Sequence, residues 1–178
     1  MAEIEVHDEV ESWLDSLSRG DWERVVVIVD RLGALASSAR MPFSRSLGDG
    51  LFELRFTLGR TARRITYVME EEMGNYSRWE DMRERRGAVS DERRDEVEQD
   101  LALGQLVYDL RTAAGLSQRE LAVRMKTTQS VISRLEEGGG ARNRIDTLAR
   151  LATALGRHLV LSFPQEPAAR TPDSVQVA

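Results

Sequence analysis

The chain has no cysteine and little histidine, two of the residue types from which enzymes build metal sites and nucleophiles. None of its 178 residues is cysteine, which excludes a disulfide framework and thiolate metal ligands. Its two histidines, His7 and His158, are far apart in the sequence. A zinc site or a histidine-based nucleophile is therefore not expected, and we predict that the protein holds no metal and no cofactor.

Long apolar segments are also missing. No run approaches the roughly 20 apolar residues that a membrane-spanning helix needs. The first residues, Met-Ala-Glu-Ile-Glu-Val, have neither the basic region nor the apolar core of a signal peptide. We therefore expect a cytoplasmic protein with no membrane partner.

Basic residues are outnumbered overall, with a net charge of −5, but they are unevenly placed. Residues 1–72 have a net charge of −5 and residues 73–100 one of −3. Residues 101–178 carry nine arginines and Lys126, the only lysine, against seven acidic residues, which gives +3. This last segment has the sign of charge that contacts with phosphate require.

Residues 115–138 have the pattern of two short helices joined by a tight turn. Gly115 can adopt the left-handed backbone that ends a preceding helix. Ser117 and Glu120 form a capping box, which starts a helix. Thr127 and Thr128 are weak helix formers and possible N-caps, which predicts the turn. The residues expected to face the core are Leu121, Ala122, Met125, Ile132 and Leu135.

The second of these helices, from about Gln129 to Glu137, is predicted to present polar groups to a DNA groove. Its outward residues offer amide, hydroxyl and guanidinium groups: Gln129, Ser130, Ser133 and Arg134. Such groups bond base edges and phosphates in a major groove. The alternative is a helical hairpin that only packs and binds nothing.

This stretch resembles the Xre/Cro/C1 helix-turn-helix family of phage-repressor-like proteins. The matching residues are Leu116-Ser117-Gln118, Glu120-Leu121-Ala122, Thr127-Thr128-Gln129, Ile132-Ser133-Arg134-Leu135-Glu136 and Gly138. The resemblance implies that Gln118 clamps a phosphate and braces the recognition helix. It also implies that the base-reading face consists of Thr128, Gln129, Ser130 and Arg134. Ser133, and Arg142 in the loop that follows, complete the expected DNA-binding set.

The rest of this region is predicted to be helical, with a terminal strand. Leu103, Leu106 and Leu110 form the inner stripe of a first helix. A later helix is capped by Asn143 with Asp146, and its inward residues are Ile145, Leu148, Leu151, Ala152 and Leu155. Residues 157–163 are predicted to form a strand, whose partner is either a second copy, giving a dimer, or the N-terminal hairpin. Residues 164–178 are predicted to be a disordered tail.

The N-terminal third reads as a strand, two helices and a hairpin. We expect a strand at residues 3–6, a helix capped by Asp8, and a second helix from Trp22 to about Ala36, after a break at Gly20-Asp21. Alternation then predicts strands at residues 51–56 and 63–69 around a Gly59-Arg60 turn. The helices' predicted inward residues are Val10, Trp13, Leu14, Leu17, Val25, Ile28, Val29, Leu32 and Leu35.

This order, with Leu-Phe-Glu-Leu-Arg and Arg-Arg-Ile-Thr-Tyr on the two strands, resembles the RelE/HigB (phage Gp49-like) toxins. Those are small α+β ribonucleases that cut messenger RNA on the ribosome. The resemblance implies that Arg55 and Arg64 neutralise the scissile phosphate. Here, however, an acidic run at residues 70–72 follows the second strand, and the sheet is short of at least one strand. We expect an inactive remnant, or alternatively that Arg55, Arg63 and Arg64 are ordinary solvated residues.

Residues 73–100 resemble the opening of a HigA-type antitoxin, including an initiator-like Met73. Ser77 with Glu80 predicts one helix, and Ser90 predicts a longer one that continues to Leu110. One interpretation is a charged linker helix. The other is an inhibitory segment that packs on the toxin-like sheet through Tyr76, Trp79 and Met82.

The sequence thus predicts an α+β chain: a RelE-like fragment of two helices and a small antiparallel sheet, then an all-α lambda-repressor-like domain with a terminal strand. The expected boundaries are 1–72, 73–100, 101–163 and 164–178. We expect a nucleoid-associated bacterial DNA-binding autorepressor of toxin–antitoxin type, which is a homodimer on palindromic double-stranded DNA. One alternative is a messenger RNA endoribonuclease that acts on the ribosome and is silenced by its fused antitoxin. The other is an interaction module whose acidic third recruits or blocks another partner. A cognate toxin is a further possible partner.

Overall fold

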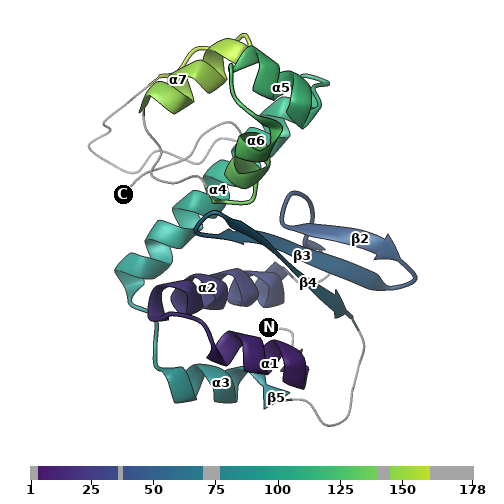
Figure 1. The fold of residues 1–178 in the computed structure, drawn as a ribbon, viewed down its shortest axis with the longest axis vertical. Coiled ribbons are helices and arrows are strands. Elements are labelled where there is room, and N and C mark those ends of the chain that lie inside the picture. Colours follow the sequence, from purple (N-terminus) through teal and green to yellow (C-terminus); the bar gives the residue numbers. More distant parts are fainter. Residues whose placement is uncertain (1–3, 36–37, 70–76, 140–144, 161–178) are drawn as a thin grey trace. The chain divides into compact units, whose positions relative to one another are not determined.

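The computed structural model describes residues 4–35, 38–69, 77–139 and 145–160, and it divides the chain into two compact units (Figure 1). The first unit is Met1–Glu98 and the second is Gln99–Ala178. The elements of the first unit are β1 (Glu5–Val6), α1 (Asp8–Asp15), α2 (Arg19–Leu35), β2 (Ser44–Gly48), β3 (Leu51–Leu58), β4 (Thr61–Val68), β5 (Ser77–Arg78) and α3 (Trp79–Arg86). Helix α4 (Asp91–Ala113) begins in the first unit, and the second continues with α5 (Gln118–Arg124), α6 (Gln129–Glu136) and α7 (Ile145–Ala154). The predicted α+β class is confirmed.

The main sheet is antiparallel, with strand order β2-β3-β4. The predicted hairpin about Gly59-Arg60 is confirmed, with Leu54 opposite Ile65 across β3 and β4. Strand β2 was not expected, and it adds a third strand to the outer side of β3. Alternate apolar residues of β3 supply the buried face: Leu54, Phe56 and Leu58. This is the period of two of a strand with one covered face, and Thr57 between them is buried as well.

Helix α2 is the centre of the first unit. Residues 25–29 are buried without interruption, whereas the sequence predicted a single apolar stripe. On one side, the Arg24 guanidinium donates to the carbonyl of Thr57 on β3 at 3.2 Å. On another side, the Trp22 ring lies 5.4 Å from that of Trp79 on α3. A helix covered on several sides is apolar around most of its circumference, which explains the run of valines.

The ends of the first two helices differ from the prediction. The N-cap of α1 is His7, whose Nδ1 accepts from the Glu9 N–H at 3.3 Å, and not Asp8. Helix α2 begins at Arg19, so Gly20-Asp21 lies inside its first turn and does not break it. The reason is Ser18, whose hydroxyl accepts from the Asp21 N–H at 3.2 Å. Leu35 was expected to be buried but is 41% exposed.

Residues 77–98 are an integral part of the first unit. Strand β5 pairs with β1, with Val6 opposite Ser77, so Ser77 does not cap the next helix as predicted. The indole N–H of Trp79 donates to Asp30 of α2 at 3.0 Å. The predicted packing of this segment on the sheet is therefore wrong, because its anchor Trp79 packs against helix α2. Met82 is buried, and Tyr76 lies outside the described residues.

Arginines of α3 and of the first turn of α4 strengthen this attachment. The Arg83 and Arg94 guanidinium groups each lie 3.2 Å from the carboxylate of Asp30. Arg86 lies over the Trp22 ring at 4.5 Å and donates to the carbonyls of Leu14 at the end of α1 and Leu17 in the turn that follows. The Ser77 hydroxyl and the Arg85 guanidinium both bond to Glu11 and lower the pKa of its carboxyl.

The second unit packs α4, α5, α6 and α7 around one apolar core. Its buried members include Leu103, Val107, Leu121, Ile132 and Leu151. Ile145 was expected in this core but is 60% exposed. The predicted strand at residues 157–163 is absent at 157–160, which have no regular secondary structure, and its last three residues lie outside the described residues. No helix in the described ranges is long and apolar enough to span a membrane.

Candidate nucleic-acid interface

Local sequence signals fix the two helices of the predicted motif. The Ser117 hydroxyl accepts from the Glu120 N–H at 3.2 Å, and the Glu120 carboxylate accepts from the Ser117 N–H at 2.7 Å. This confirms the capping box at the start of α5, and the same two bonds lower the pKa of Glu120. Helix α5 ends at Arg124, and after a short turn α6 begins at Gln129.

The turn itself contains an unusual backbone. Lys126 has φ +52°, which is the left-handed region that residues with a Cβ adopt at a cost. Thr128 precedes α6 in extended conformation but makes no side-chain cap bond. Its hydroxyl instead lies 2.9 Å from that of Ser130. The Thr127 N–H stabilises the turn by donating to the carbonyl of Ala122 at 2.9 Å.

The core side of the motif is as predicted. Leu121, Ala122 and Met125 of the α5 region and Ile132 and Leu135 of α6 are all buried. Burial of these five side chains orients α6, so that its opposite face is directed outward.

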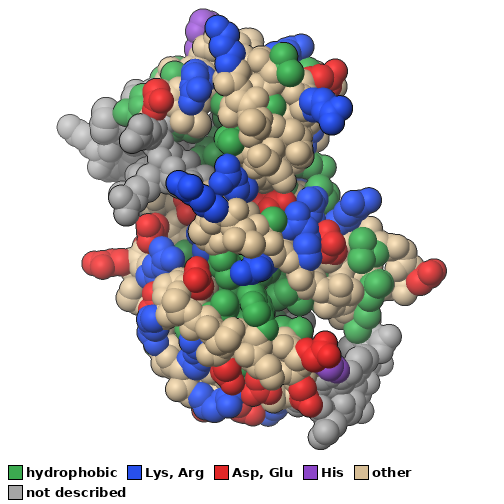
Figure 2. All heavy atoms as spheres, viewed as in Figure 1, with side chains coloured by type: hydrophobic (Ala, Val, Ile, Leu, Met, Phe, Trp, Pro, Cys, Tyr) green, Lys and Arg blue, Asp and Glu red, His purple; other side chains and the backbone are tan. Residues whose placement is uncertain are grey.

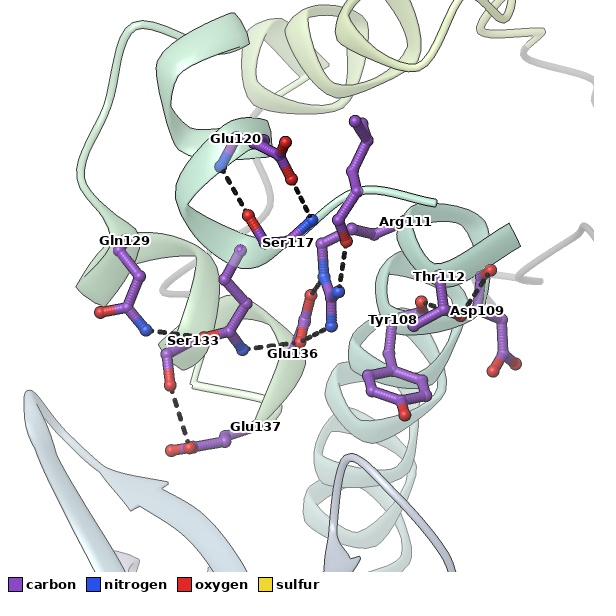
Figure 3. A network of polar contacts seen from close by, with 12 residues as sticks. Tyr108, Asp109, Arg111, Thr112, Ser117, Glu120, Gln129, Ser133, Glu136 and Glu137 are labelled. Carbon is purple, nitrogen blue, oxygen red and sulfur yellow. Dashed lines mark hydrogen bonds and ion pairs between the residues drawn. The ribbon is translucent and has the colours of Figure 1, made fainter. Parts of the chain in front are cut away.

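A buried ion pair, which was not predicted from the sequence, connects α6 to α4. The Arg111 guanidinium of α4 donates to both carboxylate oxygens of Glu136, with the Nη2–Oε2 distance 3.0 Å (Figure 3). Its third nitrogen donates to the carbonyl of Leu116 at 2.7 Å. The side chain of Arg111 is 9% exposed and that of Glu136 is 1% exposed. A charge this deep is tolerated only when it is paired and hydrogen-bonded.

A signal for this pair was present in the sequence. Arg111 lies four residues after Val107, and Glu136 four residues after Ile132, so each charge shares a helix face with a core residue. Two opposite charges on the apolar faces of neighbouring helices indicate a buried pair. Gly104 was also overlooked, although a Cβ there would lie 2.4 Å from the carbonyl oxygen of Glu136.

The structure brings most of the predicted DNA-binding residues together around the N-terminal end of α6. Thr128, Gln129 and Ser130 are exposed. Gln118, at the start of α5, accepts a hydrogen bond from the Gln129 amide at 2.6 Å. Its own amide donates to Glu136 at 2.8 Å.

One turn further along α6, the two remaining residues are half-exposed. Arg134 donates to the carbonyl of Ser130 at 3.3 Å. Ser133 donates to the carboxylate of Glu137 at 3.1 Å (Figure 3). Arg142 lies outside the described residues. The arrangement offers amide, hydroxyl and guanidinium groups on the exposed surface of a short helix, which is chemistry suited to base edges and phosphates.

The predicted catalytic arginines lie on the sheet of the first unit. Arg55 of β3 and Arg64 of β4 are directly opposite each other. Between them, the Glu53 carboxylate lies 3.4 Å from Nε of Arg55 and 3.6 Å from Nε of Arg64. Both guanidinium groups therefore face an acidic neighbour. In the described ranges, no group of three histidine or acidic side chains could hold a metal ion.

Charged and apolar side chains alternate over the visible surface, and no single-sign patch covers a whole unit in this view (Figure 2). The net charge of residues 101–178 is only +3.

Two known families match separate parts of the chain, one on each side of the boundary between the two units. Residues 12–76 match the family model of phage-derived Gp49-like proteins, and residues 107–161 match a helix-turn-helix family model of Xre/Cro/C1 type. This is the order that the sequence predicted, and each match covers less than half of the chain. No curated protein and no solved structure matches the chain.

Proposed function

We propose that this chain, in which a Gp49-like unit precedes a helix-turn-helix unit, binds double-stranded DNA sequence-specifically through α6. The observation that carries this proposal is the polar group of exposed Gln129 and Ser130 and half-exposed Arg134 on α6. The opposite face of this helix is fixed by the core and by the ion pair of Glu136 with Arg111. Rigid support of this kind is what base reading needs. The helix-turn-helix family match supports it independently.

We further propose that the protein is an autorepressor of toxin–antitoxin type and acts as a homodimer. An eight-residue recognition helix contacts only a few base pairs, so two copies on a palindromic site supply the remaining specificity. The Gp49-like match supports the fusion of a toxin-like unit to the helix-turn-helix unit, from which we propose the toxin–antitoxin context.

The test is a double substitution on the reading face, Gln129→Ala with Arg134→Ala, in the full chain. The DNA is a preferred sequence selected from a randomised duplex library with the unchanged chain. Loss of two base contacts should weaken binding to this selected site by about 1–3 kcal/mol per contact, and the midpoint of unfolding should not change. The matched control is Gln105→Ala with Arg150→Ala, which removes the same side-chain types from α4 and α7. Equal affinity of the two double variants for that site would refute the assignment of the reading face.

A ribonuclease is the alternative function, and the pairing of Arg55 with Arg64 across β3 and β4 is the observation in its favour. Glu53 counts against it, because its carboxylate contacts both guanidinium groups and repels a phosphate. RNA cleavage by the full chain that disappears in Arg55→Ala with Arg64→Ala would establish this alternative.

A further inference from the structure

The main sheet of the first unit has two different edges (Figure 1). Strand β2 forms one edge, and it is five residues long with an irregular register between Ser46 and Gly48. Strand β4 forms the other edge, and among the described strands it pairs only with β3. Its eight residues keep a regular register with β3 from Thr61 to Val68. Because bulges and short edge strands hinder pairing between molecules, β4 is the edge better suited to accept another strand.

The direction of the hydrogen bonds shows which residues of β4 are turned to this edge. The Arg55 N–H of β3 donates to the carbonyl of Phe43 at 2.7 Å. The odd-numbered residues of β3 therefore bond toward β2, and the even-numbered ones bond toward β4. Since Leu54 lies opposite Ile65, the odd-numbered residues of β4 bond to β3. The N–H and C=O groups at the even-numbered positions of β4 are directed away from β3.

One antiparallel register pairs this edge with the same edge of a second copy. A register centred on Ile65 places Ala62 opposite Val68 and Arg64 opposite Thr66, so that every even-numbered residue of β4 faces another one. Moving the centre to Arg64 places two arginines directly opposite each other, which is destabilising. Moving it to Thr66 leaves Ala62 with no partner in β4. The strand is therefore self-complementary in one register.

We infer that β4 pairs with β4 of a second copy about a twofold axis at Ile65, and that this contact is the interface of the proposed homodimer. The inference rests on the homodimer part of the proposed function and not on DNA binding. It replaces the strand predicted at residues 157–163 as the dimer contact, because residues 157–160 have no regular secondary structure.

The side chains that meet across this contact are compatible. Arg63 lies opposite Tyr67, whose ring stacks on Phe52 at 5.3 Å, and a guanidinium group beside a tyrosine ring is attractive. Ala62 meets Val68, which is 38% exposed in the single chain. No two like charges are opposite each other, and isoleucine, threonine, tyrosine and valine are residues that favour strands.

The first test uses single cysteines in the full-length chain, which has none of its own. In Ile65→Cys, the two thiols of a dimer are opposite each other with Cα atoms about 4.5 Å apart, which suits a disulfide. Mild oxidation should make the covalent dimer the main species on a non-reducing gel. Ala62→Cys is the matched control, because its counterpart would be about 20 Å away along the paired strands. It should remain mostly uncrosslinked.

The second test is Thr66→Arg, measured by sedimentation equilibrium without DNA. Within one chain the new arginine lies opposite Glu53, which favours the fold. Across the contact it lies opposite Arg64, and the twofold axis repeats this repulsion. The dissociation constant of the dimer should rise about tenfold, while the midpoint of urea unfolding should not fall. Ser46→Arg, which adds the same charge to the β2 edge, should leave the dissociation constant unchanged.

Failure of the inference can be told apart from failure of the proposed function. Equal crosslinking of the two cysteine variants, or a dimer that Thr66→Arg does not weaken, overturns the inference and leaves the homodimer. Dissociation of the dimer by Val160→Arg instead would assign the interface to the C-terminal segment and also overturn it. A chain that is monomeric at every concentration overturns the homodimer as well, whereas DNA binding through α6 is measured separately.

Discussion

Lys126 is the residue whose backbone fits its side chain least well among those described in α5, α6 and their turn. Its φ of +52° places a residue with a Cβ in the left-handed region, which costs roughly 1 kcal/mol relative to glycine. The turn geometry is set by the packing of α5 and α6, so the residue has to adopt it.

Lys126→Gly is therefore expected to raise the free energy of unfolding by about 0.5–1 kcal/mol, measured by urea denaturation. Lys126→Ala is the control, because it removes the same charge but keeps a Cβ in the left-handed region. If the alanine variant proves as stable as the glycine variant, the gain in stability does not come from relief of backbone strain at this position.

Gly104 lies in helix α4 at a position that has no room for a side chain. An added Cβ would lie 2.4 Å from the carbonyl oxygen of Glu136 and 3.0 Å from the amide nitrogen of Gly138. Backbone atoms cannot move aside as a flexible side chain can. Close approach of α4 to the end of α6 therefore depends on glycine here.

Gly104→Ala should destabilise the second unit by about 1–2 kcal/mol, since overpacking costs about 1–3 kcal/mol and helix propensity returns about 1 kcal/mol. Gly20→Ala is the matched control, because Gly20 also lies in a helix but has open space around its Cβ position. That variant should be neutral or more stable. If thermal unfolding shows that the two variants are destabilised by the same amount, the close contact with Glu136 does not explain the effect of Gly104→Ala.

At the scale of elements, helix α3 is the least expected part of the first unit. It lies beyond the Gp49-like match, which ends at residue 76, yet Trp79 is 2% exposed and contacts both Trp22 and Asp30 of α2. Its charged residues indicated a solvated linker. Long-range contacts with α1 and α2, which no local pattern encodes, turn it into a packed helix.

Trp79→Ala should lower the stability of the first unit by about 3–5 kcal/mol, measured by denaturation of the full chain followed by far-ultraviolet circular dichroism. Trp79→Phe keeps an aromatic ring but removes the bond to Asp30, so its stability should fall by less than that of the alanine variant. Glu84→Ala, an exposed change on the same helix, is the control. An alanine variant as stable as this control would mean that α3 is only loosely attached.

Elements with a strong local signal were predicted well from the sequence. The capping box of Ser117 and Glu120, the apolar spacing of α6 and the alternation of β3 each determine one element from neighbouring residues. Strand β2 was missed because only its first residue, Ser44, is buried, so its sequence does not alternate. Pairing of β1 with β5 joins segments about 70 residues apart, and no local pattern reveals it.

The same distinction applies to the candidate site. Gln129, Ser130 and Arg134 could be predicted because an exposed polar face beside an apolar stripe is a local pattern. The bonds of Gln118 with Glu136 and Gln129 could not, because they depend on how α5 meets both ends of α6. The sequence identified the groups that face outward but not the interactions that orient them.

For the whole molecule, the two family matches leave residues 77–106 between them. The structure divides this segment, since residues 77–98 belong to the first unit and the remainder to the second. The acidic excess lies in the first hundred residues and the basic excess in the remainder. DNA binding is accordingly expected from the second unit, with specificity from base contacts and little help from general charge.

Sequence-specific DNA binding is tested most directly by a nuclease footprint of the full-length chain on the DNA upstream of its own gene, at low salt and against an excess of random duplex. The proposed function predicts protection of two half-sites whose centres lie about one helical turn, roughly 10 base pairs, or a multiple of it apart, and loss of that protection in Gln129→Ala with Arg134→Ala. Binding that shows no preference for this region over random duplex would contradict it.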